Sequence, residues 1–157
     1  MEIFTTIHVI ISLIAIFAGL VALAGMLNNS DLHRWTAIFL AFTVATSVTG
    51  FLFPFHGFTP AIGVGIISMI LLAIAIFARY SRHTVGHWRW LYVVTAIMSL
   101  YLNCFVLVVQ SFQKIPALKA LAPTQSEPPF AVAQLTVLVL FIVLTIISLI
   151  RFRPKRT

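Results

Sequence analysis

The sequence predicts an all-α integral membrane bundle of five transmembrane helices, and three observations support this prediction. Hydrophobic residues make up 61% of the 157 residues, whereas charged residues make up only 8%. A soluble domain carries roughly 25% charged residues, so lipid rather than water must surround most of this chain. The apolar residues also fall into five long segments that are separated by short polar stretches.

Each apolar segment is close to the roughly 20 residues that a helix needs to cross a bilayer. The backbone must satisfy its own hydrogen bonds in hydrocarbon, which favours helices over open strands. We expect spans at about 3–27, 34–53, 60–80, 88–112 and 130–150. Residues 1–157 then form a single transmembrane domain, with a long loop at 113–129 and a basic tail at 151–157.

Turn-forming residues mark the limits of these segments in chain order. The first segment is expected to be an uncleaved span, because only Glu2 and no positive charge precedes it, and it ends at the polar run 28–31. The second stops at Pro54, which cannot continue a helix, and the third begins with Pro60, a favourable first-turn residue. The fourth leads into the long loop, where residues 115–122 predict a short surface helix before the fifth span.

The distribution of lysine and arginine predicts that the N-terminus is outside and the C-terminus is in the cytoplasm. Cytoplasmic loops carry the excess of basic residues. Two basic residues lie on one side, Lys114 and Lys119, and eight lie on the other: Arg34, Arg79, Arg82, Arg89, Arg151, Arg153, Lys155 and Arg156. This charge borders the membrane and forms no soluble basic face, so nucleic acid is not an expected partner.

The sequence lacks the signatures of several functional classes. The central part of each expected span contains no Asp, Glu, Lys or Arg, which disfavours an ion-coupled transporter. The chain also has no phosphate-binding Gly-rich loop, no His-Glu-x-x-His and no Gly-x-Ser-x-Gly. We therefore expect a non-catalytic protein.

Polar side chains of four expected spans fall in the outer half of the bilayer and predict a binding pocket there. The candidate ligand-binding residues are His8, Ser12, Ser47, His56, Asn103, Gln110 and Gln134, walled by Phe51, Phe53, Phe55 and Phe58. Imidazoles, amides and aromatic rings suit a planar, partly polar ligand such as a quinone headgroup or haem b. The alternative is tight helix packing with ordinary interhelical hydrogen bonds.

The five histidines divide between the two sides of the expected membrane. His8 and His56 are on the outer side and would be the axial ligands of an outer haem, whereas His33, His83 and His87 are on the inner side. The alternative for each histidine is a structural or solvated role.

Short signals in the first third of the chain resemble a known family. They are Ile7-His8 at the start of the first span, Gly19 and Gly25 within it, Leu32-His33-Arg34-Trp35 at the start of the second, and Thr49-Gly50 near its end. This pattern resembles a family of small uncharacterised bacterial polytopic membrane proteins that is loosely similar to cytochrome b561. The resemblance implies a bacterial inner (cytoplasmic) membrane and no established activity, and the cytochrome likeness implies haem and electron transfer. Only the positions of His8 and His33 are carried over from it, without a role. Thr36 stands where the pattern usually has glycine.

Three functional hypotheses follow from these observations. The first is a small accessory subunit or lipophilic-ligand binder, with a polar pocket formed by the first, second, fourth and fifth spans. The alternative is a redox membrane protein that binds b-type haem or quinone, and a small solute carrier is a weaker third. The lipid bilayer is the expected partner, and a larger membrane complex or a homo-oligomer is left open.

Overall fold

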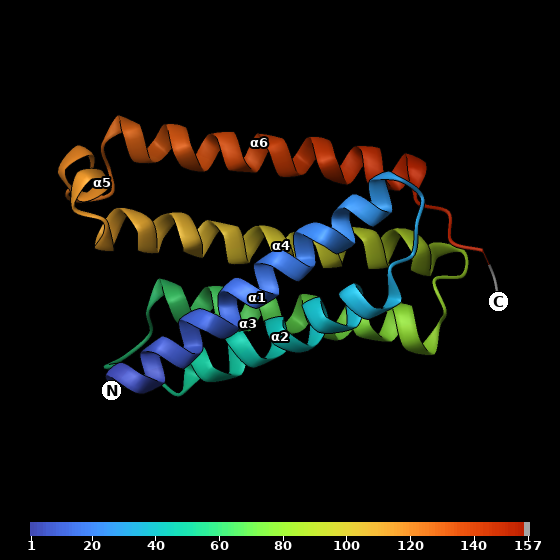
Figure 1. The fold of residues 1–157 in the computed structure, drawn as a ribbon, viewed down its shortest axis with the longest axis horizontal. Coiled ribbons are helices and arrows are strands. Elements are labelled where there is room, and N and C mark those ends of the chain that lie inside the picture. The colour runs from blue at the N-terminus through green and yellow to red at the C-terminus, as the bar shows by residue number, and fades with distance from the viewer. Residues whose placement is uncertain (156–157) are drawn as a thin grey trace.

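The computed structural model describes residues 1–155 as a bundle of long helices that run along one axis (Figure 1). No strand occurs within these residues, which confirms the all-α class. The elements are α1 (Glu2–Leu27), α2 (His33–Phe51), α3 (Pro60–Ile76) with the π-helical turn η1 (Phe77–Ser81), α4 (His87–Lys114), α5 (Pro116–Leu121) and α6 (Pro128–Arg151).

Four helices are long and apolar enough to cross a membrane: α1, α3 together with η1, α4 and α6. The helix α2 is not among these four, because its 19 residues include His33 and Arg34 in the first turn and four threonines further along. It nevertheless lies in the bundle and returns the chain from the end of α1 to the start of α3 (Figure 1). These helices have the lengths and composition of a multi-pass membrane protein.

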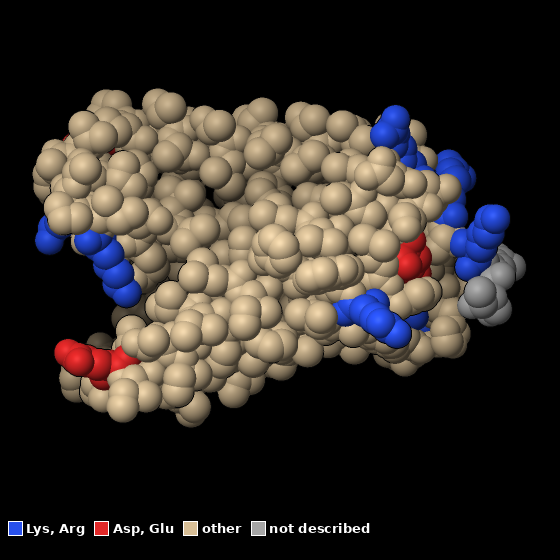
Figure 2. Space-filling view, viewed as in Figure 1, with Lys and Arg blue, Asp and Glu red and all other residues tan. Residues whose placement is uncertain are grey.

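Charged side chains gather at the two ends of the bundle, and the long middle of the visible face is free of them (Figure 2). We call one end the basic end, because it holds Arg34 of α2, Arg79 and Arg82 around η1, and Arg151 of α6. We call the other the N-terminal end, because α1 begins there; α4 also ends there, across the bundle from the start of α1 (Figure 1).

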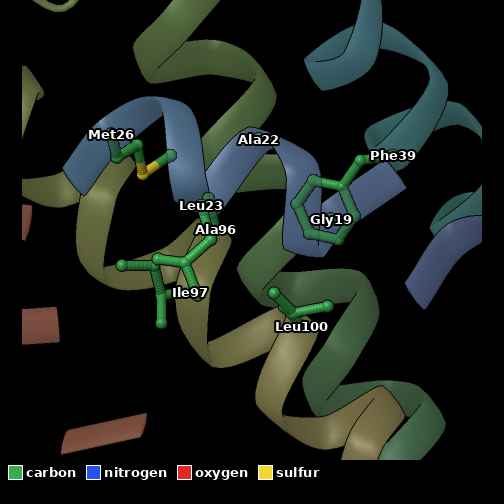
Figure 3. Close-up of a pocket in the computed structure, with 8 residues that line it drawn as sticks. All are labelled: Gly19, Ala22, Leu23, Met26, Phe39, Ala96, Ile97 and Leu100. Carbon is green, nitrogen blue, oxygen red and sulfur yellow. The ribbon is translucent and has the colours of Figure 1, made fainter. Parts of the chain in front are cut away.

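Helix α1 crosses the bundle diagonally, packing along α2 and reaching α4 and α6 toward the basic end (Figure 1). The crossing is centred on Gly19, where an added Cβ would lie 2.6 Å from Leu100 Cδ1 and 2.8 Å from Phe39 Cδ1. Figure 3 shows Phe39 and Leu100 packed against this glycine. Only about 10 Å³ of apolar void remains at the crossing, so it is closely packed core.

An ion pair between Arg79 and Asp31 joins neighbouring elements at the basic end. Arg79 of η1 is only 7% exposed, and its Nη2 donates a hydrogen bond to Asp31 Oδ1 at 2.8 Å. The same nitrogen lies 3.1 Å from His33 Nδ1, and the guanidinium lies 5.3 Å from the centre of the Tyr92 ring. These contacts join the link between α1 and α2 to η1 and α4.

Two other arginines hold the C-terminal end of α6. Arg89 of α4 donates from Nη1 to the carbonyl oxygens of Leu149 at 2.9 Å and Phe152 at 2.8 Å. Arg151 donates from Nη1 to the carbonyl of Leu27, the last residue of α1, at 3.1 Å. The last carbonyls of a helix have no partner within it, so side chains of this kind satisfy them.

The loop before α6 is closed by Glu127, the residue that directly precedes the helix. Its side chain makes no capping bond to α6. Instead its carboxylate accepts hydrogen bonds from the Thr124 hydroxyl at 2.7 Å and from the backbone N–H of Thr124 and Ser126. The hydrogen bond from the Thr124 hydroxyl, and after it the bonds from the backbone N–H groups, hold the pKa of Glu127 below its usual value.

Candidate functional site: a cavity at the N-terminal end

A cavity of about 650 Å³ lies at the N-terminal end between α1, α2, α3 and α4. Pockets that hold small molecules usually measure roughly 300–1,000 Å³. Figure 2 views the bundle from the side and shows the hollow between the tips of α4 and α5 and those of α1 to α3. The opening therefore faces sideways as well as endwards, because α1 leans away from α4 beyond the crossing (Figure 1).

Five of the seven predicted site residues line this cavity: His8, Ser12, Ser47, Asn103 and Gln110. Three of the four predicted aromatic walls, Phe51, Phe53 and Phe55, line it too, whereas Phe58 is 78% exposed. Side chains that are far apart in the sequence therefore line one cavity.

The two other predicted residues lie elsewhere. His56 is exposed in the connection between α2 and α3 and does not line the cavity. Gln134 of α6 donates to the carbonyl of Phe105 at 3.3 Å, and its buried Oε1 has no partner among the described residues. Gln134 lies outside the cavity because α3, and not α6, forms the fourth wall. The short connection after α2 brings α3 to this side of α4, and α6 packs against α4 outside the cavity.

His8 is held in a fixed orientation on the wall formed by α1 and α2. Its Nδ1 lies 2.7 Å from the hydroxyl oxygen of Thr49. The Phe53 ring meets the imidazole edge to face, with ring centres 5.1 Å apart. Gly50 leaves space beside the ring, since a Cβ there would lie 3.7 Å from His8 Cε1. The sequence did not reveal Thr49 as the partner of His8, because the two residues are 41 positions apart.

Most hydroxyl groups on this wall donate to their own helix. Ser12 donates to the carbonyl of His8 at 2.7 Å, and Thr46 donates to the carbonyl of Phe42 at 2.8 Å. Each hydroxyl has one hydrogen and two lone pairs, so both oxygens can still accept.

The wall formed by α4 carries amide groups, which can donate as well as accept. Asn103 Nδ2 donates to the Thr43 hydroxyl at 3.3 Å. Gln110 is exposed and lines the cavity further along α4, nearer to the mouth of the cavity. Lys114, the last residue of α4, lines the mouth itself. The cavity thus combines apolar surface from residues such as Val9, Leu13 and Val106 with a few polar groups, as ligand pockets do.

The structure does not bring together the histidines that were predicted to hold haem. His8 lines the cavity and His56 does not, while His33 contacts Arg79 at the basic end. Within residues 1–155 no three side chains of His, Cys, Asp or Glu gather as metal ligands. The axial pair His8 and His56 therefore gains no support from the geometry.

No known protein family, curated protein or solved structure matches this chain. The resemblance of its first third to small bacterial membrane proteins and to cytochrome b561 therefore stays a prediction.

Proposed function

We propose that this protein is a non-catalytic membrane protein that binds a lipophilic small molecule in the cavity at the N-terminal end. The observation that carries the proposal is the cavity itself, about 650 Å³ of mostly apolar surface with polar groups at a few positions. Protein interiors are closely packed, and an unfilled space forfeits contacts. A ligand with an apolar body and a polar head would supply those contacts.

Binding without catalysis is supported by what lines the cavity. Its lining residues within 1–155 include one imidazole and one lysine but no Asp, Glu or Cys. The partner of the His8 ring is a hydroxyl group and not a carboxylate that would prepare it as a base. Quinones also have an apolar body and a polar head, so a quinone-binding redox protein stays the alternative proposal.

We also propose that the chain crosses the membrane five times, with the N-terminal end outside. The path of α2 supports the count, since α1 and α3 run in the same direction and the chain must return between them (Figure 1). The arginines of the basic end support the orientation. The cavity would then open into the outer half of the bilayer. The assignment to a bacterial inner membrane rests on the sequence resemblance.

Reporter fusions test this topology. A reporter after Thr157 is expected to be active only in the cytoplasm, and one inserted in the loop 123–127 only outside. The same location for both reporters would contradict five crossings, because α6 alone lies between the two positions and a single crossing must place them on opposite sides of the membrane.

Filling the cavity tests the proposed function. We expect Val106→Trp to abolish the retention of a lipophilic molecule by the purified protein, because the indole would occupy the space between α1 and α4. The measurement is mass spectrometry of apolar compounds extracted from equal amounts of each protein. Wild-type protein should retain one compound in near-stoichiometric amount.

The matched control is Val139→Trp. Val139 lies on α6, is 59% exposed and does not line the cavity, so the same substitution should leave retention unchanged. Equal retention by the Val106 variant and the wild type would overturn the proposal.

A further inference from the structure

We infer that the ligand carries a hydroxyl group and that His8 Nε2 accepts its hydrogen, which makes a lipid alcohol the class of molecule for this cavity. The inference rests on the proposed function and names its ligand class. It depends on which nitrogen of His8 carries the hydrogen.

The hydrogen bonds of Thr49 favour one assignment, with the hydrogen of His8 on Nδ1. The Thr49 hydroxyl has one hydrogen, and two carbonyl oxygens of its own helix lie within reach, that of Ala45 at 2.7 Å and that of Thr46 at 3.1 Å. With its hydrogen directed there, the Thr49 oxygen can only accept from His8 Nδ1 at 2.7 Å. In a neutral imidazole one nitrogen donates and the other accepts. His8 Nε2 is therefore an acceptor, and no described residue donates to it.

The surroundings of His8 point to the same ligand chemistry. The hydroxyls of Ser12 and Thr46 on this wall also donate to their own helix and keep only lone pairs free. The amide N–H groups of Gln110, and the second one of Asn103, lie on the α4 wall of the cavity. An alcohol can donate to the first wall and accept from the second, whereas an ether or a ketone can only accept.

Two sources carry this chemistry in a membrane: a free lipid alcohol and the glycerol headgroup of a phospholipid. Both would reach the cavity from the lipid side through the opening between α1 and α4 (Figure 2). The experiment distinguishes them by adding each one separately.

The test is competition for labelled farnesol on the full chain in phosphatidylcholine nanodiscs at pH 8, where an ordinary histidine is neutral. Unlabelled farnesol is expected to compete roughly three- to tenfold better than its methyl ether, the range for one hydrogen bond. His8→Phe should bring this ratio to about one. The control His56→Phe should keep the wild-type ratio, because His56 is exposed and lies outside the cavity lining.

A second variant keeps the imidazole and changes only its tautomer. Thr49→Val removes the oxygen that holds the Nδ1 hydrogen, so the preference for the alcohol should fall although His8 remains. If the His8→Phe protein does not fold, this variant still tests the inference, because it keeps the imidazole in place. Competition by phosphatidylglycerol with labelled farnesol would support the inference with a glycerol headgroup as the source.

Two outcomes would overturn the inference, and they differ in what they say about the cavity. Equal competition by farnesol and its ether in wild-type protein would remove the hydroxyl requirement and leave lipophilic binding intact. The absence of farnesol binding together with unchanged retention in Val106→Trp would remove the proposed function as well.

Discussion

Replacement of Arg79 by methionine is expected to lower the free energy of unfolding by about 3 kcal/mol, near the lower end of what breaking a buried ion pair costs. Arg79 is almost fully buried, and its guanidinium contacts Asp31, His33 and the Tyr92 ring. Methionine would fill the space and leave the Asp31 carboxylate without its main partner. The carboxylate is 23% exposed, so water compensates in part and the cost stays below the upper end of the range.

Thermal unfolding of the detergent-solubilised protein measures this effect. The control is Arg34→Met on the same end of the bundle, because Arg34 is exposed and should change stability by less than about 0.5 kcal/mol. The double variant Asp31→Asn, Arg79→Met should be more stable than Arg79→Met alone, since no unpaired charge then remains. Additive losses would show that the ion pair is not what holds this end together.

Replacement of Gly25 by alanine is expected to destabilise the protein by about 2 kcal/mol, within the range for overpacked cores. A Cβ at Gly25 would lie 2.8 Å from the carbonyl oxygen of Ser30 and 2.9 Å from Leu32 Cγ. The link between α1 and α2 folds back here, and the Ser30 N–H donates to the Gly25 carbonyl at 2.7 Å. The contact is with backbone, which cannot rotate away, so the whole link would have to move.

The matched substitution is Gly50→Ala, which should have the opposite sign. Its Cβ would meet only His8 Cε1, at an ordinary distance of 3.7 Å. Alanine in a helix is more favourable than glycine by roughly 0.5–1 kcal/mol, so this variant should be slightly more stable. Unfolding midpoints of the two variants on the same side of the wild type would contradict this account of the two glycines.

The positions of the helices could be predicted from sequence because each one carries its own signal. The five apolar segments correspond to α1, α2, α3 with η1, α4 and α6, and Pro60 starts α3 as expected, with Thr59 as its cap. The π-helical turn η1 carried no such signal, because its residues 77–81 simply continue the apolar and basic pattern of the third span. The apolar character of α2 was overestimated, since the helix contains His33, Arg34 and four threonines. Thr46 and Thr49 donate to carbonyl oxygens of their own helix, which satisfies these hydroxyl groups within the helix.

The candidate site could be predicted only where residues share one helix face. His8 and Ser12 are four positions apart and line the same cavity, as do Asn103 and Gln110 at a spacing of seven. The choice of α3 over α6 as a wall depends on how whole helices pack, which no spacing within one helix reveals. The pairing of Asp31 with Arg79 across 48 positions was invisible for the same reason.

For the ligand that we propose, the sideways opening between α1 and α4 changes what a measured affinity means. A molecule that enters from the lipid never has to dissolve in water, so its relevant concentration is its mole fraction among the lipids. The amount of lipid in an assay then dilutes the ligand, just as buffer volume does for a soluble receptor. Weak intrinsic binding can still give high occupancy, because a hydrophobic molecule concentrates in the bilayer before it meets the cavity.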